Sequence, residues 1–132
     1  MRMHRYRKGA RGERELIQIF SQSGFSVIRA AGSGVNSLSP DILVFRRGRQ
    51  YALECKAWDN GRVAIEPDKY EALRQWEDNT GITTMIAWKM PYEGWYFIYL
   101  SELEKNERSY SITKRRAREI NRTLDSIKGQ PG

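Results

Sequence analysis

Residues 40–56 read PDILVFRRGRQYALECK, and they contain the clearest structural signal of the sequence. Two runs, 41–45 and 51–56, flank a basic turn that contains Arg47 and Gly48. Runs of apolar residues on either side of a short turn predict a β-hairpin. Both runs are apolar on both faces, which is typical of strands that are covered on each side. We therefore expect this hairpin at the centre of a sheet that has helices packed on it.

The hairpin brings two acidic residues together. If residues 47–48 form a two-residue turn, the pairing along the strands places Asp41 opposite Glu54. Directly opposed residues have Cβ atoms about 4.5–5.5 Å apart, where like charges destabilise a sheet unless something offsets them. Mg²⁺ would offset them, because it binds oxygens of one or two carboxylates and keeps positions for water and phosphate oxygens. The pair predicts a Mg²⁺ site, at which Mn²⁺ would substitute.

A lysine belongs to the same face of the hairpin. Lys56 lies two residues after Glu54, so the period of two along a strand puts both side chains on one face and Cys55 on the other. An ammonium at this position would orient the attacking water or stabilise charge that builds up on a phosphate. Lys56 is therefore our candidate for a catalytic lysine that assists the nucleophile or the transition state.

Glu13 is a third candidate acid. It precedes Leu16, Ile17 and Phe20 at the spacing of one helix face, and that face is the one expected to pack inward. An acidic residue near a helix N-terminus is also favoured by the helix dipole alone. Glu13 by itself is therefore compatible with either a catalytic or a structural role.

The remaining periodicity predicts one mixed α/β domain over residues 1–132, with a central sheet flanked by helices in the order α-β-β-β-α-β-β-α. The expected elements are a helix over about 8–23, a strand over 25–30, the hairpin, a helix from Pro67 to before Gly81, strands over 83–88 and 95–100, and a last helix within 111–132. Residues 1–7 are expected to form a basic, mobile arm. The last helix and strand 95–100 are our candidates for a contact with a second copy, although the helix could instead cover its own subunit.

The charge of the chain points to an anionic partner. The 132 residues include 23 Lys and Arg against 16 Asp and Glu, a net charge of +7, which favours nucleic acid binding. Positive charge gathers in residues 1–14 and again in residues 114–122, although such runs are often simply solvated. The longest apolar run has six residues, Trp95 to Leu100, against the roughly 20 that a membrane helix needs. With one cysteine and no apolar leader, we expect a cytoplasmic protein that does not bind membranes.

Several short motifs together resemble a known family, the archaeal Holliday junction resolvases of the PD-(D/E)xK nuclease superfamily. The motifs that carry the resemblance are Lys8-Gly9, Glu13-Arg14-Glu15-Leu16, Arg29-Ala30-Ala31-Gly32-Ser33, Pro40-Asp41 and Glu54-Cys55-Lys56. The resemblance covers most of residues 5–100 and implies a restriction-endonuclease-like fold. The sequence departs from the superfamily pattern at two places. Many members carry a Gln on the helix after Glu-x-Lys, and the nearest candidate here is Lys69. The loop over 34–39 is also long.

The resemblance also implies roles for individual residues. Glu13, Asp41 and Glu54 would be the metal-binding and catalytic acids, Lys56 the catalytic lysine and Ser33 a catalytic loop serine. Arg14 and Arg29 match arginines that the family uses for catalysis or DNA contact. We expect the DNA backbone to be bound by basic residues near the N-terminus as well, namely Arg5, Arg7, Lys8 and Arg11.

The function implied is resolution of four-way DNA junctions in recombination and repair. The resemblance implies a homodimer that makes paired, symmetric nicks with 5′-phosphate and 3′-hydroxyl ends, with a divalent metal and no small-molecule cofactor. Two other functions stay open at this point. One is a nuclease of the same superfamily that acts on duplex or flap DNA, and the other is a basic DNA-binding protein without catalysis, in which the acids are structural charges.

Overall fold

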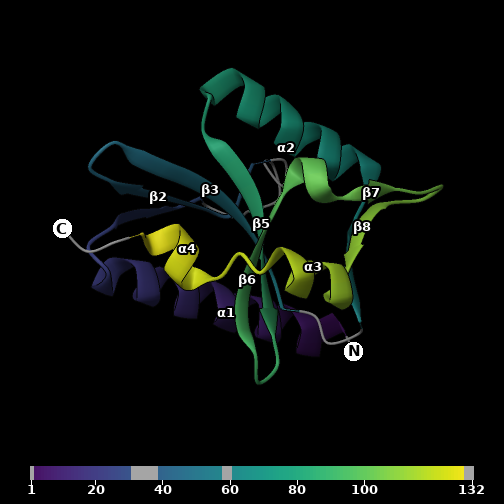
Figure 1. Ribbon diagram of the computed structural model, residues 1–132, viewed down its shortest axis with the longest axis horizontal. Coiled ribbons are helices and arrows are strands. Elements are labelled where there is room, and N and C mark those ends of the chain that lie inside the picture. Colours follow the sequence, from purple (N-terminus) through teal and green to yellow (C-terminus); the bar gives the residue numbers. More distant parts are fainter. Residues whose placement is uncertain (1, 31–38, 58–60, 130–132) are drawn as a thin grey trace.

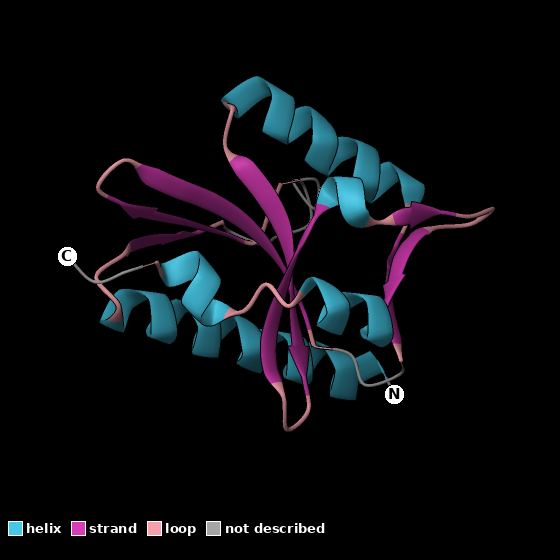
Figure 2. Ribbon diagram, in the orientation of Figure 1, coloured by secondary structure: helices cyan, strands magenta, loops and turns pink. Residues whose placement is uncertain are grey.

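The computed structural model describes the backbone of residues 2–30, 39–57 and 61–129, and the side chains of these ranges from residue 11 onward. Figures 1 and 2 show the elements and their arrangement. Their bounds are α1 (Arg2–Gln22), β1 (Ser26–Arg29), β2 (Ile42–Arg46), β3 (Arg49–Lys56), β4 (Arg62–Ile65), α2 (Pro67–Thr80), β5 (Thr83–Met90), β6 (Gly94–Tyr99), η2 (Leu100–Glu102), β7 (Glu104–Lys105), β8 (Tyr110–Thr113), α3 (Lys114–Ile120) and α4 (Leu124–Lys128).

The main sheet has the strand order β1-β2-β3-β5-β6, with β3 and β5 parallel and the other neighbours antiparallel. The β2–β3 hairpin lies inside the sheet, as predicted. Its register pairs Arg46 with Arg49 and continues to Ile42 and Leu53. Arg47 and Gly48 have φ angles of 45° and 84°, which fits the two-residue turn that pairs strands tightly in hairpins. The predicted mixed α/β architecture is confirmed.

The sheet is covered on both faces, as the apolar hairpin predicted. Helices α1 and α4 pack on one face, where Leu16, Phe20 and Ile127 belong to one buried cluster. Helix α2, with α3 and the small sheet, covers the other face with a second cluster that contains Leu73. Figure 1 shows α1 and α2 on opposite sides of the strands. Alternation along β5 supplies both clusters, so that each face of the central strands is buried.

The structure has a second sheet that the sequence pattern did not predict. It has the order β4-β8-β7, and Val63 of β4 pairs with Ile112 of β8. These strands are short and only Val63 and Ile65 of β4 are buried, so the alternation spans too few residues to stand out. The expected helix over 111–132 therefore begins only after β8.

That last helix is also broken in two. Asn121 ends α3 with φ of 54°, a left-handed conformation that Asn tolerates better than most residues. The next residue, Arg122, accepts a hydrogen bond from the Phe97 N–H at 2.8 Å, and α4 begins after Thr123. The backbone of residues 121–123 thus runs along the edge of β6, which an unbroken helix would not allow.

The start of the first helix needs correction, and the position of the last helix bears on the predicted contact with a second copy. Helix α1 begins at Arg2 and not near Lys8, so residues 2–7, which we expected to precede the helix, are part of it. The apolar stripe of the last helix packs on its own chain, where Ala117 is 0% and Ile127 is 4% exposed. Strand β6 is likewise buried at Trp95. These side chains cover their own subunit, as the alternative allows, and a contact of this helix and strand with a second copy stays a prediction.

Candidate active site

The two hairpin acids meet where β2 begins and β3 ends. Asp41 directly precedes β2, and its N–H donates to the Leu53 carbonyl at 2.9 Å, which continues the hairpin ladder by one residue. The Cys55 N–H donates to Asp41 Oδ2 at 2.8 Å. These two bonds fix the Asp41 carboxylate beside Glu54 of β3, as the predicted register requires.

Glu54 is buried but poorly satisfied. The residue is 6% exposed, and among the described residues its Oε1 atom has no hydrogen-bond partner. Two ammonium groups lie nearby: Lys56 Nζ is 3.9 Å from Oε2, and Lys69 Nζ is 3.5 Å from Oε1, longer than a normal hydrogen bond. Burial and the charge of Asp41 raise the pKa of Glu54 to about 7 in spite of both lysines.

Asp41 is perturbed in the same direction. Burial raises its pKa above the usual range, the bond from Cys55 opposes this, and repulsion by Glu13 raises the pKa further. The repulsion means that Glu13, on α1, lies within electrostatic reach of Asp41. Glu13 itself accepts a hydrogen bond from Arg29 Nε at 2.5 Å. The predicted third acid is thus near enough to repel Asp41 and is paired with a predicted arginine.

The donor set suits a hard divalent cation. Within the described ranges, no three His, Cys, Asp or Glu side chains gather closely enough to hold an ion by themselves. Mg²⁺ commonly takes only one or two protein carboxylates and fills its other positions with water and phosphate oxygens. Asp41 and Glu54 offer such a pair, including one buried oxygen that the described residues leave without a hydrogen bond. Glu13 stands apart from this pair, and its metal-binding role stays a prediction.

The other predicted site residues fall into three groups. Arg11 and Arg14 are exposed on α1, and the Arg29 side chain is 60% exposed although it holds Glu13. Arg5, Arg7 and Lys8 lie on the helical backbone of α1, but their side chains are outside the described part of the chain. Ser33 lies outside the described residues altogether.

Lys69 is the residue that sequence reasoning placed least well. The sequence marks it only as a departure from a family pattern, yet it lies next to Glu54. Its position in the first turn of α2 was the one available signal. The contact itself depends on how α2 packs on the sheet, which local sequence does not specify.

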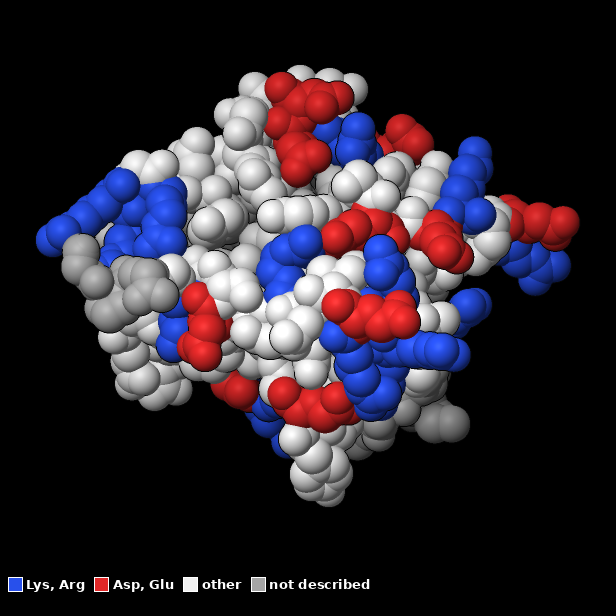
Figure 3. Space-filling view, in the orientation of Figure 1, with Lys and Arg blue, Asp and Glu red and all other residues white. Residues whose placement is uncertain are grey.

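The basic run in residues 114–122 proves largely neutralised. Arg118 makes a two-pronged contact with Glu93, at 2.7 and 2.5 Å, and Arg122 does the same with Glu102, at 2.8 and 3.1 Å. Arg116 lies 3.7 Å from Glu119. Figure 3 shows acidic side chains interleaved with the basic ones around α3. This region is therefore a weaker candidate for phosphate contacts than its composition indicates.

Comparison with known proteins identifies the family of this chain. The sequence model of the archaeal Holliday junction resolvase family, Hjc, matches residues 4–130. The chain belongs to this family. A crossover junction endodeoxyribonuclease Hjc of Archaeoglobus fulgidus is 33% identical over 106 residues, covering 80% of this chain and 78% of the relative. The Hjc of Methanocaldococcus jannaschii is 34% identical over 113 residues, covering 85% and 80%.

The solved structures lead to the same family. The structure of Archaeoglobus fulgidus Hjc, described as a Holliday junction resolvase from an archaeal hyperthermophile, superposes with a TM-score of 0.82 at 26% identity. The match covers 95% of this chain and 98% of that one, so this Hjc chain shares the whole fold. No helix in the described ranges is long and apolar enough to cross a membrane.

Proposed function

We propose that this Hjc chain is an endodeoxyribonuclease that resolves four-way DNA junctions by metal-dependent hydrolysis. One observation carries the proposal: Glu54, buried beside Asp41, keeps an oxygen without a hydrogen-bond partner among the described residues. A structural carboxylate at this depth would be expected to have its oxygens satisfied. The relatives named above are crossover junction endodeoxyribonucleases, which supports the same substrate class.

The metal is proposed to be Mg²⁺, with Mn²⁺ as a substitute, held by Asp41 and Glu54. When bound, the ion supplies Lewis-acid polarisation of the scissile phosphate and lowers the pKa of a coordinated water. Asp41 is held in place by the Cys55 N–H, so it offers its carboxylate in a fixed direction. Glu13 is proposed to complete the site, and it binds Arg29, which is paired with Ile42 at the same end of the sheet.

Lys56 is proposed as the catalytic lysine. Its Nζ lies 3.9 Å from Glu54 Oε2, and its side chain is 24% exposed, so the ammonium stands at the border between the buried acids and solvent. A cation at this border would orient the attacking water or stabilise negative charge on the phosphate. The loop serine, Ser33, is proposed to contact the substrate at the same site.

The DNA backbone is proposed to lie along α1. Arg11 and Arg14 are exposed there, and Arg5, Arg7 and Lys8 precede them on the same helix. Contacts of this kind release counterions, so affinity should fall steeply with salt and depend little on sequence. A homodimer would place two sites on the two-fold symmetric junction and give paired nicks with 5′-phosphate and 3′-hydroxyl ends.

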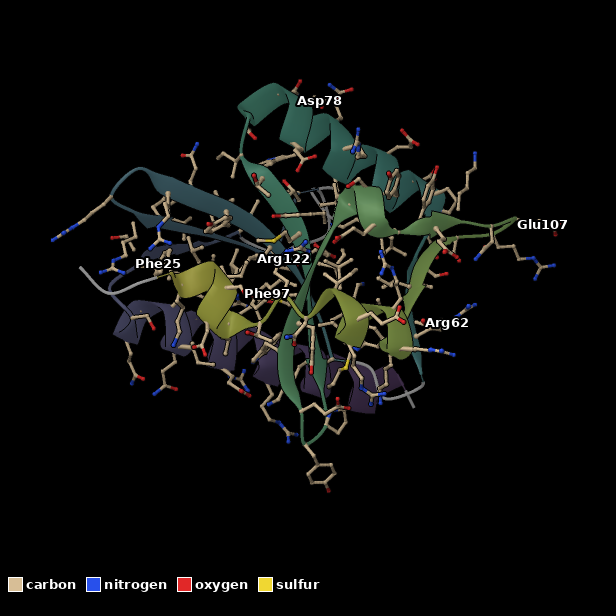
Figure 4. The ribbon with its side chains drawn as sticks, viewed as in Figure 1. Phe25, Arg62, Asp78, Phe97, Glu107 and Arg122 are labelled. Atoms are coloured by element: carbon tan, nitrogen blue, oxygen red, sulfur yellow. The ribbon has the colours of Figure 1, made fainter. Side chains whose placement is uncertain are left out.

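The test is cleavage of a labelled four-way junction beside a linear duplex of the same sequence, with and without Mg²⁺. The variant is Glu54→Gln, and the matched control is Glu107→Gln at the exposed β7–β8 turn (Figure 4). Symmetric nicks on the junction alone, lost in Glu54→Gln and kept in Glu107→Gln, would support the proposal. Equal cleavage of the duplex would indicate a different nuclease, and binding without cleavage would leave a non-catalytic DNA-binding protein.

A further inference from the structure

Lys69 connects two segments that build the site. Its Nζ lies 3.5 Å from Glu54 Oε1 and donates a hydrogen bond to the Ser39 carbonyl at 3.0 Å. Ser39 is two residues before Asp41, and Glu54 is the other member of the acid pair. One ammonium on α2 therefore touches both the strand that carries Glu54 and the segment that leads to Asp41.

The two contacts differ in kind. The bond to Ser39 has the length of an ordinary hydrogen bond, whereas the approach to Glu54 is too long for one. Lys69 thus lends its charge to Glu54 without taking up a lone pair of Oε1. The Lys69 side chain is only 19% exposed and that of Glu54 only 7%, so solvent screens their interaction less than at a surface pair.

We propose that Lys69 is a positioning residue with two separable effects on this site: its charge competes with a divalent cation at Glu54, and its hydrogen bond to Ser39 holds the segment that carries Asp41. The inference rests on the proposed function, because it assigns the competing ion to the same acid pair. It adds a residue outside the predicted set of acids and the catalytic lysine.

The charge effect has a definite sign. A monovalent cation beside Glu54 repels a divalent one that binds there, and the repulsion is lost when the lysine is replaced by a neutral residue. At this separation, with partial screening, we expect metal affinity to rise about three- to tenfold. Loss of the Ser39 bond acts in the opposite direction, because Asp41 is then held less firmly.

Three substitutions separate the effects. Lys69→Gln removes the charge and keeps an N–H donor for Ser39, Lys69→Met removes both, and Lys69→Arg keeps both. A merely structural lysine would lower metal affinity in both the Gln and the Met variants. The proposal instead predicts that Lys69→Gln binds metal more tightly than the wild type, with Lys69→Met below Lys69→Gln and Lys69→Arg within about twofold of the wild type.

The experiment is a titration of DNA-free protein with Mn²⁺ at fixed pH and ionic strength, in which electron paramagnetic resonance counts the free ion. Lys105→Gln, an exposed lysine on β7, is the matched control and should bind Mn²⁺ as the wild type does. Urea unfolding of each variant verifies that it is folded.

Tighter Mn²⁺ binding by Lys69→Gln, with the order given above, supports the proposal. Binding by Lys69→Gln equal to or weaker than that of the wild type overturns the inference and leaves the proposed function intact. Absence of Mn²⁺ binding by the wild type, together with cleavage that persists in EDTA, overturns both.

Discussion

Two clusters of side chains in this Hjc chain both place carboxylates beside cations, but their carboxylates are satisfied to different degrees. The first, the site cluster, consists of Asp41, Glu54, Lys56 and Lys69 around the end of the hairpin. The second, the edge cluster, consists of Glu102, Arg122 and Tyr99 where residues 121–123 cross β6. In Figure 4, Arg122 of the edge cluster lies near Phe97, in the middle of the molecule.

The edge cluster is fully paired. Arg122 donates to both Glu102 oxygens, and its Nη1 also donates to the Phe97 carbonyl at 3.0 Å. The Tyr99 N–H donates to Glu102 Oε1 at 2.7 Å, and the Arg122 guanidinium lies 3.6 Å from the centroid of the Tyr99 ring. Burial alone would raise the pKa of Glu102, but the bonds from Arg122 and Tyr99 lower it on balance.

In the site cluster, the carboxylates are incompletely satisfied. Its carboxylates repel each other, both have raised pKa values, and one buried oxygen lacks a hydrogen bond from the described residues. Satisfied ionic networks stabilise a fold, whereas a perturbed and unsatisfied one is a candidate for ligand binding or catalysis. The difference indicates that the edge cluster stabilises the fold, whereas the site cluster is completed by a ligand that the described residues do not supply.

The largest expected effect separates the clusters by activity. Asp41→Asn should lower the rate of junction cleavage about a thousandfold or more, because it removes a proposed metal ligand worth several kcal/mol in the transition state. Glu102→Gln should leave the rate within about threefold of the wild type, because Glu102 belongs to the edge cluster. Single-turnover cleavage with saturating enzyme measures both rates. Equal losses of rate in the two variants would contradict a functional difference between the two clusters.

The second effect is the pH dependence of stability without metal. A carboxyl whose folded pKa is raised from 4.5 to about 7 contributes full stability below pH 4.5 and loses it as the pH rises through 7. Glu54 should therefore cost about 3 kcal/mol of unfolding free energy between pH 4.5 and pH 8. Urea unfolding in EDTA should show this slope in the wild type and lose it in Glu54→Gln.

At the edge cluster, Glu102 should give the unfolding free energy the opposite pH dependence. Glu102 has a lowered pKa, so its contribution is present above the unfolded value and is lost as the pH falls through the folded one. A wild type without extra loss of stability on the alkaline side, relative to Glu54→Gln, would contradict the assignment of Glu54.

A smaller effect is expected from breaking the edge cluster itself. Arg122→Met should lower the unfolding free energy by about 2 kcal/mol, since it removes a two-pronged ion pair and a bond to a backbone carbonyl. Cleavage at a temperature where the variant is folded should stay close to that of the wild type. A stable variant with impaired cleavage would place Arg122 in the functional machinery.

The smallest effect concerns the ring beneath Arg122. Tyr99→Leu should cost about 0.5–1 kcal/mol, because the ring is 40% exposed and the cation–π contact is partly solvated. Thermal unfolding compared with Tyr92→Leu, an exposed tyrosine of the β5–β6 turn, measures this contribution. A loss of unfolding free energy as large as that of Arg122→Met would mean that the ring contributes most of the stability of the edge cluster.

The two clusters also differ in how far the sequence predicts them. Asp41 and Glu54 are linked through a two-residue turn, so local pairing rules fix their register, and Lys56 follows from strand periodicity. Lys69 reaches Glu54 only through the packing of α2 on the sheet, which no local pattern specifies.

The edge cluster depends on contacts far apart in the chain. Arg122 meets the carbonyl of Phe97 across 25 residues, and that contact accompanies the break between α3 and α4. Periodicity alone continues the helix through this point, since Ile120 and Leu124 keep helical spacing. The pairing of β4 with β8 is not predicted either, because it joins two short strands that are far apart in the sequence.

The open coordination at the site cluster is expected to be filled by a divalent cation. This expectation is tested most directly by the change in unfolding free energy when Mn²⁺ is added at pH 8, for the wild type, Glu54→Gln and Glu102→Gln. The account predicts a gain for the wild type and for Glu102→Gln, about 2.7 kcal/mol at a hundred times the dissociation constant, and almost none for Glu54→Gln. An equal gain in Glu54→Gln, or no gain in the wild type, would contradict it.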